Sequence, residues 1–345
     1  MIGFRVDANE KVATGHLMRC IAIAEMCRRK GEECLFILAE EKETERLRKR
    51  NFPYDILHSD WADMSGEKEK MEKLIEEKAF SFLLVDSYKA TTEYLRHLNS
   101  RVPVMYIDDF GKTKIPVSAV LHYGIGAEEK NYQREYEQDG VKVLMGMEYI
   151  PLREEFMEKE IPHQKREKSI LVTTGGTDTY HITGKFLEQC FSELEKNGTS
   201  FLKDYQYEVI VGALNSHIHE LEAFALEHPE VRIHKNVSNM SEYMRKCKMA
   251  ISAGGTTLYE LCACGIPTVC FSFADNQKPG TAAFGKSGLM DYVGDARETD
   301  VVKNMLSSLQ RLHENETVYK ERQEKMQKAV AGKGAWRIAT FLCTP

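Results

Sequence analysis

Residues 5–20 read Arg5-Val-Asp-Ala-Asn-Glu-Lys-Val-Ala-Thr-Gly-His16-Leu-Met-Arg-Cys20 and join an apolar run to an amphipathic one. The run Ile2–Val6 predicts a strand, and Leu17–Arg29, with apolar residues at helical spacing, predicts a helix. His16 then stands at the carboxyl end of a strand, where ligands bind in open α/β sheets. The positive end of a helix disfavours an imidazolium, so we expect His16 to be available as a neutral base.

The same alternation of short apolar and longer amphipathic runs continues along the chain. It predicts parallel strands with helices on both faces of a sheet, in an α/β fold. The expected strands are Ile2–Val6, Cys34–Leu38, Phe82–Val85, Val104–Ile107, Ala119–His122, Ile170–Thr173, Tyr207–Val211, Val231–His234, Met249–Ser252 and Thr268–Phe271. The expected helices are Leu17–Arg29, Glu67–Glu77, Ala90–Leu98, His181–Glu195, His217–Leu226, Met240–Lys246, Thr257–Cys264 and Gln277–Leu289, with a long helical tail at about Val301–Thr340.

The alternation pauses between residues 124 and 168, a polar region that contains Pro151 and Pro162. Its charged, turn-prone segment 158–168 is interpreted as an interdomain linker. We therefore expect two Rossmann-like, doubly wound domains, residues 1–160 and 168–345, with the C-terminal helix packing back on the first. Two such domains facing across a cleft make a natural ligand site.

Composition excludes several classes of protein. The 345 residues carry a net charge of −6, which predicts no broad basic surface for nucleic acid. No apolar stretch is long enough for a transmembrane helix, and the N-terminus does not resemble a signal peptide. The nine cysteines are scattered without zinc-site spacing, so we expect free thiols in a cytoplasmic protein. No cofactor is expected; the oligomeric state stays open, and a monomer is plausible.

Two loops of the second half place paired glycines and a threonine between a strand and a helix. They are Gly175-Gly176-Thr177-Asp178 and Gly254-Gly255-Thr256-Thr257, the second followed by Glu260. Glycines allow a ligand to approach the backbone closely, and helix N–H groups favour phosphate. The alternatives are a tight turn, helix capping by the hydroxyls and a helix-dipole role for Glu260. Two such loops in one half favour a diphosphate site.

Other polar residues follow strands, and helix or loop capping explains them as well as function does. Asp275, Asn276 and Gln277 could contact a sugar, but an N-cap by Asp275 or Asn276 is favoured. Asp86, Asp108 and Asp109 could bind a metal, but without a His or Cys ligand set no metal site is predicted. His16 itself gains weight only from its position and from the diphosphate loops in the other half.

Taken in order, these motifs resemble the UDP-sugar hydrolases of pseudaminic acid biosynthesis, the PseG family, and the related SpsG-type spore coat polysaccharide proteins. Both are relatives of the MurG-like glycosyltransferases, so the resemblance implies a GT-B-like fold over nearly the whole chain. The segments that carry it are Arg5-Val-Asp7, Gly15-His16-Leu-Met-Arg19-Cys20, Val85-Asp86-Ser-Tyr88, Ile107-Asp108-Asp109, Pro151-Leu-Arg153-Glu154-Glu-Phe156, Gly175-Gly-Thr-Asp178, Ser252-Ala-Gly-Gly-Thr-Thr-Leu-Tyr-Glu260 and Asn276-Gln277.

The resemblance implies removal of UDP from a diacetamido-trideoxy-altrose, releasing the free sugar. By it, His16 matches the histidine that activates water, Tyr88 lines the same pocket, and Glu260 binds the ribose. The remaining implied substrate-binding residues are Asp7, Gly15, Arg153, Gly175, Gly176, Thr177, Asp178, Gly255, Thr256, Thr257, Asn276 and Gln277. The chain departs from the family's Gly-x-Gly-His at Ala13, which bears on the path of the loop.

These residues predict attack of water at the anomeric carbon with UDP as the leaving group and, if attack is direct, inversion. A glycosyltransferase would use the same donor site but transfer the sugar to a hydroxyl acceptor. The mostly charged segment 57–78 shows no exposed stripe for a lipid-linked acceptor. A non-catalytic sugar-nucleotide-binding protein is the second alternative.

Overall fold

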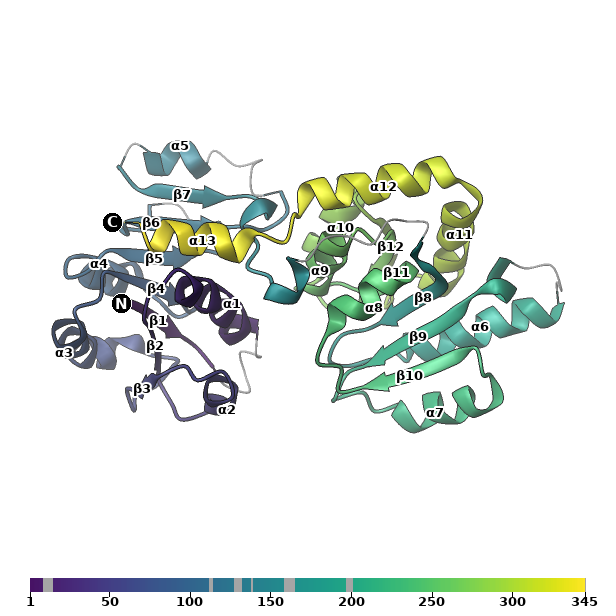
Figure 1. Cartoon of the computed structure of the whole chain (residues 1–345), viewed down its shortest axis with the longest axis horizontal. Coiled ribbons are helices and arrows are strands. Elements are labelled where there is room, and N and C mark those ends of the chain that lie inside the picture. Colours follow the sequence, from purple (N-terminus) through teal and green to yellow (C-terminus); the bar gives the residue numbers. More distant parts are fainter. Residues whose placement is uncertain are drawn as a thin grey trace. The chain divides into compact units, whose positions relative to one another are not determined.

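The computed structural model describes residues 1–8, 15–111, 114–126, 132–137, 139–157, 165–196 and 201–344. The chain divides into two compact units, one of residues 1–154 with 332–345 and the other of residues 155–331. Each unit is built on one sheet whose strands are all parallel (Figure 1). The α/β class expected from the alternating runs is therefore confirmed.

The first unit contains a seven-stranded sheet in the order β3-β2-β1-β4-β5-β6-β7. Its elements are β1 Ile2–Val6, α1 Gly15–Arg29, β2 Cys34–Leu38, α2 Thr44–Arg48, β3 Tyr54–Ile56, η1 Met64–Glu67, α3 Lys68–Lys78, β4 Phe82–Asp86, α4 Thr92–Asn99, β5 Val104–Ile107, β6 Ala119–His122, α5 Tyr132–Glu137, β7 Lys142–Met145, η3 Met147–Tyr149 and, near the end of the chain, α13 Gly334–Leu342. The short helix η4, Glu154–Phe156, spans the boundary between the units.

The second unit contains a six-stranded sheet in the order β10-β9-β8-β11-β12-β13. Its elements are β8 Glu167–Thr173, α6 Ile182–Lys196, η6 Phe201–Asp204, β9 Gln206–Val211, α7 Ile218–Glu227, β10 Val231–Lys235, α8 Met240–Lys246, β11 Cys247–Ala253, α9 Thr257–Cys264, β12 Thr268–Ser272, α10 Lys278–Lys286, β13 Asp291–Asp295, α11 Val301–Glu314 and α12 Glu316–Ala329.

Side-chain alternation along the strands builds the first unit's core. One face of the sheet, with Ile37, Val85 and Tyr106, packs in a single cluster with apolar residues of α3, α4 and α5. The other face holds Phe4, stacked on Phe36 with ring centroids 5.1 Å apart. Because both faces are covered, the strands are apolar throughout, which explains why they were recognisable as continuous apolar runs.

The C-terminal helix α13 belongs to the first unit, where it lies beside α1 (Figure 1). The Phe341 ring meets Phe82 edge-on at 5.8 Å, and Nζ of Lys30 lies 4.1 Å from the centroid of the Trp336 ring. Gly334 begins this helix against the Ile150 carbonyl, since a Cβ at Gly334 would lie 2.1 Å from that oxygen. The close approach of backbone to backbone explains the glycine.

The sequence analysis did not predict three strands, β3, β7 and β13. All three lie at the edges of their sheets. Their short sequences mix polar with apolar residues, as edge strands exposed to solvent do. The helix expected over Gln277–Leu289 ends at Lys286, where Gly288, with a φ of +69°, turns the chain into β13. The short helices α2 and α5 were also not predicted.

The tail over Val301–Thr340 is helical, as expected, and forms three helices, because Asn315 caps α12 by accepting the Val318 N–H, and Gly332, with a φ of +69°, lies between α12 and α13. One further expectation needs correction. The expected linker ends earlier than predicted, since Glu167 already begins β8. Residues 158–164 of that linker lie outside the described residues. All nine cysteines are free thiols, as expected.

Candidate active site

The candidate site of the first unit lies at the switch point of its sheet. The strand order reverses between β1 and β4, and a crevice outside the carboxyl ends of the strands forms at such a point. The parallel register pairs Val6 with Asp86, and the Asp7 N–H donates to the Asp86 carbonyl at 3.2 Å. Strand ends therefore bring acids from two separate segments beside the start of α1.

His16 is buried at the first turn of α1, with 5% of its surface exposed. Its Nδ1 lies 2.6 Å from Oδ1 of Asp86, which is also buried. A carboxylate at Nδ1 fixes the ring orientation and keeps a proton on that nitrogen, so Nε2 is the nitrogen able to accept another. The sequence reasoning missed this pairing, because it considered Asp86 only as a loop cap or a metal ligand.

Arg19, one turn after His16 on the same helix, joins two of the strand-end acids. Its guanidinium donates two hydrogen bonds to Asp86, at 2.6 and 2.5 Å, and two to Asp109, both at 2.9 Å. It also donates to the hydroxyl of Tyr123. Burial alone would raise the pKa of Asp86, but Arg19 and then His16 hold it well below its usual range. The Asp86 carboxylate is thus ionised and held in place.

Tyr88 completes a closed ring of contacts. Its hydroxyl donates to Asp109 at 2.8 Å, and its ring meets the His16 imidazole edge-on with centroids 4.4 Å apart. Burial and the adjacent Asp109 raise the pKa of the phenol, which therefore stays protonated. The structure thus brings two predicted residues, His16 and Tyr88, together and adds Arg19. The signal available in the sequence was the three-residue spacing of His16 and Arg19 on one helix face.

The side chain of Asp7 belongs to a buried hydrogen-bond network with Arg5 and Glu67 rather than to the contacts of His16. Nη1 of Arg5 donates to Asp7 at 3.0 Å, while Nε and Nη2 of Arg5 bind both oxygens of Glu67 at 2.8 and 2.9 Å. Burial raises the pKa of Asp7, and Arg5 opposes that shift.

Other predicted residues of the first unit lie near these elements. Gly15 begins α1 with open space around its Cβ position, and the half-buried Arg153 precedes η4. Ala13 lies outside the described residues.

The second unit places its three predicted segments after neighbouring strands. The order reverses between β8 and β11, so the Gly175 and Gly254 loops both lie at the switch point, and the Asn276 segment follows β12 next to them. In the first loop, Gly175 has a φ of +80°, and Thr177 is half-buried. Asp178 accepts the N–H groups of Ile182 and Thr183 at 2.8 and 3.0 Å. Asp178 therefore caps α6 with both carboxylate oxygens.

The second loop differs, because the hydroxyl of its N-cap residue Thr256 makes no capping hydrogen bond to α9. Gly255 has a φ of +148°, a conformation that requires glycine, and Gly176, Gly255 and Thr256 have exposed side-chain positions. Gly254 packs so closely on α10 that a Cβ would lie 2.1 Å from Oγ1 of Thr281. Thr257 and Glu260 lie in the first turn of α9. An N-terminus without a side-chain cap favours an anion.

The segment after β12 corrects the capping interpretation of Asp275 and Asn276. The N-cap of α10 is Gln277, and its side chain accepts the Phe273 N–H at 3.1 Å instead of capping the helix. Asp275 accepts from Arg297 at 2.7 Å, and Asn276 is exposed.

Neighbouring side chains already bind the strand-end acids of the first unit. Arg19 binds Asp86 and Asp109, and Asp108 accepts from the Tyr132 hydroxyl at 2.8 Å. Within the described ranges, the group of side chains that could hold a metal ion lies elsewhere, at His181, His217 and Glu220. The aspartates of the first unit are therefore better suited to orienting His16 and Arg19 than to ligating a metal.

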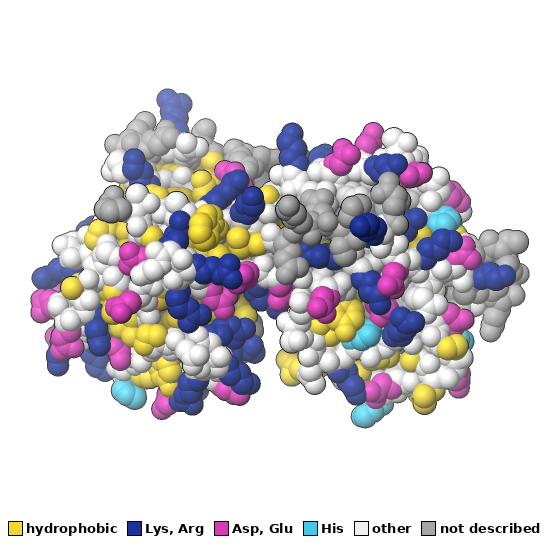
Figure 2. Space-filling view, in the orientation of Figure 1, with side chains coloured by type: hydrophobic (Ala, Val, Ile, Leu, Met, Phe, Trp, Pro, Cys, Tyr) yellow, Lys and Arg dark blue, Asp and Glu magenta, His cyan; other side chains and the backbone are white. Residues whose placement is uncertain are grey.

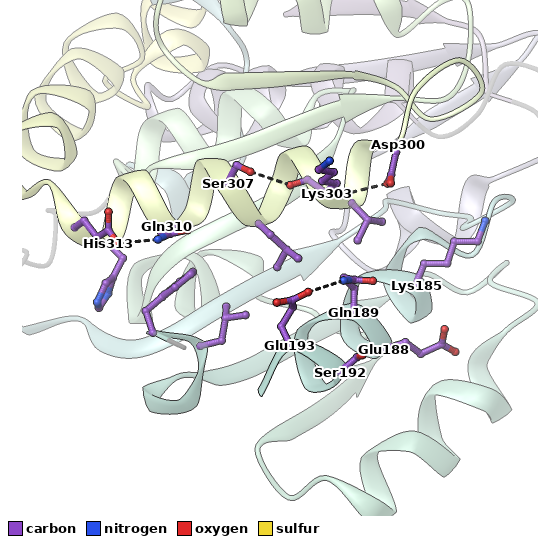
Figure 3. Close-up of a pocket in the computed structure, with 15 residues that line it drawn as sticks. Lys185, Glu188, Gln189, Ser192, Glu193, Asp300, Lys303, Ser307, Gln310 and His313 are labelled. Atoms are coloured by element: carbon purple, nitrogen blue, oxygen red, sulfur yellow. Dashed lines mark hydrogen bonds between the residues drawn. The ribbon is translucent and has the colours of Figure 1, made fainter. Parts of the chain in front are cut away.

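A groove of about 1060 Å³ lies on the second unit between α6 and α11 (Figure 3). Its polar side chains largely pair along their own helices, as Gln189 does with Glu193 at 3.1 Å and Gln310 with Glu314 at 2.8 Å. None of the predicted site residues lines it. Helix flanks rather than strand ends form its walls, so we place the candidate site at the switch points instead.

On the face shown in Figure 2, Lys and Arg side chains are interspersed with Asp and Glu on each unit. This mixture agrees with the modest net charge of −6. Among the described residues, no helix is both long and apolar enough to cross a membrane.

The fold defines the class: two parallel, doubly wound sheets of seven and six strands form the GT-B glycosyltransferase fold. The chain is similar in structure to MurG of Acinetobacter baumannii, with a TM-score of 0.67, 12% identity, and coverage of 99% of this chain and 98% of that one. It is also similar to the glycotransferase of kitacinnamycin, with a TM-score of 0.68, 14% identity, and coverage of 99% and 97%. At these identities the likeness establishes the fold alone.

Sequence comparison adds a domain match and two distant relatives. Residues 169–337 match the glycosyltransferase family 28 C-terminal domain. The chain is 23% identical over 297 residues to the spore coat polysaccharide biosynthesis protein SpsG of Bacillus subtilis, covering 83% of this chain and 81% of that protein. It is 23% identical over 280 residues to the uncharacterized protein MJ1062 of Methanocaldococcus jannaschii, covering 78% of this chain and 54% of that protein. The chain thus spans about half the length of the archaeal relative.

Proposed function

We propose that this protein hydrolyses a UDP-linked sugar to the free sugar and UDP. The observation that carries the proposal is the His16–Asp86 pair, with Nδ1 of His16 2.6 Å from the carboxylate at the switch point of the first sheet. The match of residues 169–337 to a glycosyltransferase domain and the distant kinship with SpsG support a nucleotide-sugar substrate.

In the proposed reaction, Nε2 of His16 takes a proton from water as the water oxygen bonds to the anomeric carbon. The bond from that carbon to the diphosphate oxygen breaks, and its electron pair leaves with UDP. General-base catalysis of this kind contributes about 10²–10⁴-fold. Asp86 stabilises the imidazolium that forms, and Arg19 keeps the carboxylate ionised and oriented. Tyr88 is protonated, packs against the imidazole of His16 and lines the proposed substrate pocket.

The second unit supplies the diphosphate site in this proposal. The first turn of α9, where Thr256 leaves the helix uncapped, offers N–H groups and the positive end of a helix to the leaving group. Gly175, Gly176, Gly255 and Thr257 contribute close backbone approach, and Glu260 binds the ribose hydroxyls. Asp178 acts through α6, which it caps, rather than by contact with the anion. No metal takes part in this step.

The proposed substrate is a UDP-linked diacetamido-trideoxy-altrose used in pseudaminic acid or a related surface polysaccharide. Incubation of the purified protein with this UDP-sugar and no acceptor should release UDP and free sugar in equal amounts. Direct attack should invert the anomeric centre, which NMR of the first product formed reports. Intact UDP-sugar after long incubation would contradict the proposal and support a binding protein instead.

The family 28 match favours one other candidate, a glycosyltransferase that uses the same donor site. Such an enzyme would need a hydroxyl acceptor in place of water. Release of UDP that strictly requires an added acceptor, with the sugar recovered in a glycoside, would favour the transferase over the hydrolase.

A further inference from the structure

Three metal-ligating side chains converge where α6 and α7 begin in the second unit. His181 immediately precedes α6, His217 is the N-cap residue of α7, and Glu220 lies in the first turn of α7. Nε2 of His181 lies 3.4 Å from Oε2 of Glu220, and Nδ1 of His217 lies 3.3 Å from the same oxygen. The two imidazole rings have centroids 4.2 Å apart.

These separations are those of neighbouring ligands on one metal ion. Zinc binds imidazole nitrogen and carboxylate oxygen at about 2.0–2.2 Å, so adjacent atoms of its tetrahedron lie about 3.3–3.5 Å apart. All three ligand atoms here lie within 4.8 Å of one another. Two imidazoles and one carboxylate suit zinc better than magnesium or calcium, which prefer oxygen ligands alone. We propose that His181, His217 and Glu220 bind Zn²⁺, with water as the fourth ligand.

The surroundings of His181 hold its ring in the position that coordination needs. His181 has a φ of +51°, in the left-handed region that few residues other than glycine adopt. Its ring lies over Gly184, where a Cβ would come within 2.0 Å of Nε2. Because glycine is unfavourable inside a helix, its presence in α6 is explained by the space it leaves for this ring. Nε2 is the ring nitrogen of His181 that lies beside Oε2 of Glu220, so coordination runs through Nε2.

A zinc ion here would fasten the starts of α6 and α7 to each other. The loop before α7 already rests on the first glycine loop, since the Leu214 N–H donates to the Gly176 carbonyl at 3.1 Å. Gly212 approaches the same loop so closely that a Cβ would lie 2.2 Å from the Gly175 carbonyl oxygen. Glu220 is 65% exposed, so solvent reaches the site. The inference stands independently of the proposed reaction.

The test is calorimetric titration of the full chain, freed of metal with a chelator, with ZnCl₂. One equivalent of zinc should bind, and its binding to the folded state should raise Tm by several degrees at saturating metal. His217→Ala and Glu220→Ala each remove a ligand and should weaken zinc binding by roughly tenfold or more, because even loss of an outer-shell contact to a metal ligand costs about 10–100-fold.

Two further variants keep the proposal falsifiable. His219→Ala removes a histidine of the same helix that is 93% exposed and pairs with Glu222, so zinc affinity should not change. Gly184→Ala retains all three ligands but displaces the His181 ring, so affinity should fall while circular dichroism shows the helix content retained. The proposal would be overturned if the wild type gave no heat of zinc binding or if His217→Ala bound zinc with unchanged affinity. It would also be overturned if His219→Ala lost as much zinc affinity as the ligand variants.

Discussion

Nδ1 of His16 lies 2.6 Å from Oδ1 of Asp86, although one residue lies in the first turn of α1 and the other ends β4. The two meet because β1 and β4 are parallel neighbours, so the loop after β1 and the end of β4 open at the same edge of the sheet. Both side chains are buried, and Arg19 donates to both oxygens of the Asp86 carboxylate. The pair is therefore fixed before any substrate arrives.

Replacement of His16 by Asn should lower kcat of UDP release by about 10²–10⁴-fold, because the proposed base is lost. The affinity for UDP, measured by calorimetry, should stay within a few-fold of wild type, since the proposed diphosphate contacts lie on the other unit. The control is His97→Asn, which alters a half-buried pair between His97 of α4 and Glu72 of α3. Near-normal hydrolysis by His16→Asn would show that another group activates water.

Asp86→Asn should make the protein less stable in a pH-dependent manner. The pKa of Asp86 is lowered on folding, against the effect of burial, by Arg19 and His16. A depressed pKa contributes stability above the unfolded pKa of about 4, and this contribution is lost as the pH falls through the lower folded value. At pH 7 we expect a loss of about 3–5 kcal/mol, as for a broken buried ion pair.

Urea unfolding of both proteins between pH 7 and pH 2.5 measures this difference. The gap between wild type and Asp86→Asn should be constant near neutrality and should narrow once the pH drops below about 4. A gap that widens on acidification, or does not change, would mean that the carboxylate of Asp86 is not stabilised in the folded state.

The two glycine loops should respond differently to loss of their polar side chains. Asp178→Ala removes the cap of α6 and should cost about 0.5–2 kcal/mol of stability. Thr256→Ala removes a hydroxyl that makes no capping hydrogen bond, so Tm should hardly change, while UDP binding should weaken. Thermal unfolding and calorimetry separate the two effects. A stability loss in Thr256→Ala equal to that in Asp178→Ala would refute the distinction.

Gly334→Ala should destabilise the first unit. The added Cβ would lie 2.1 Å from the Ile150 carbonyl oxygen, so α13 would have to shift, at a cost of about 1–3 kcal/mol. The matched control is Gly66→Ala, where a Cβ meets nothing within 4 Å. Chemical unfolding followed by near-ultraviolet circular dichroism should report the difference, and equal midpoints for the two variants would contradict it.

Local pattern was enough to locate most elements of both sheets. The central strands, such as β1 and β11, are buried on both faces and appear as continuous apolar runs. The edge strands β3 and β7 lack that signal because only part of each is buried. The three-helix tail was likewise hidden, since its breaks depend on single residues such as Asn315 and on packing of α13 against the first unit.

The candidate site was predictable only in part. The sequence singled out His16 and the glycine loops from their place between strand and helix, and Tyr88 through the family resemblance. It weighed Asp86 and Asp109 only as loop caps or metal ligands, because the guanidinium of Arg19 that binds them comes from another segment. It also could not connect His181 with Glu220, whose proximity depends on how α6 and α7 begin side by side.

By itself, the sequence determined the α/β class and the strand ends at which polar side chains gather, because hydrophobic periodicity is a local property of the chain. Only the tertiary structure decided which of those side chains meet. Parallel strand order brings Asp86 to His16, and Arg19 then offsets the cost of burying the carboxylate. That pairing depends on contacts between distant segments, which no local pattern encodes.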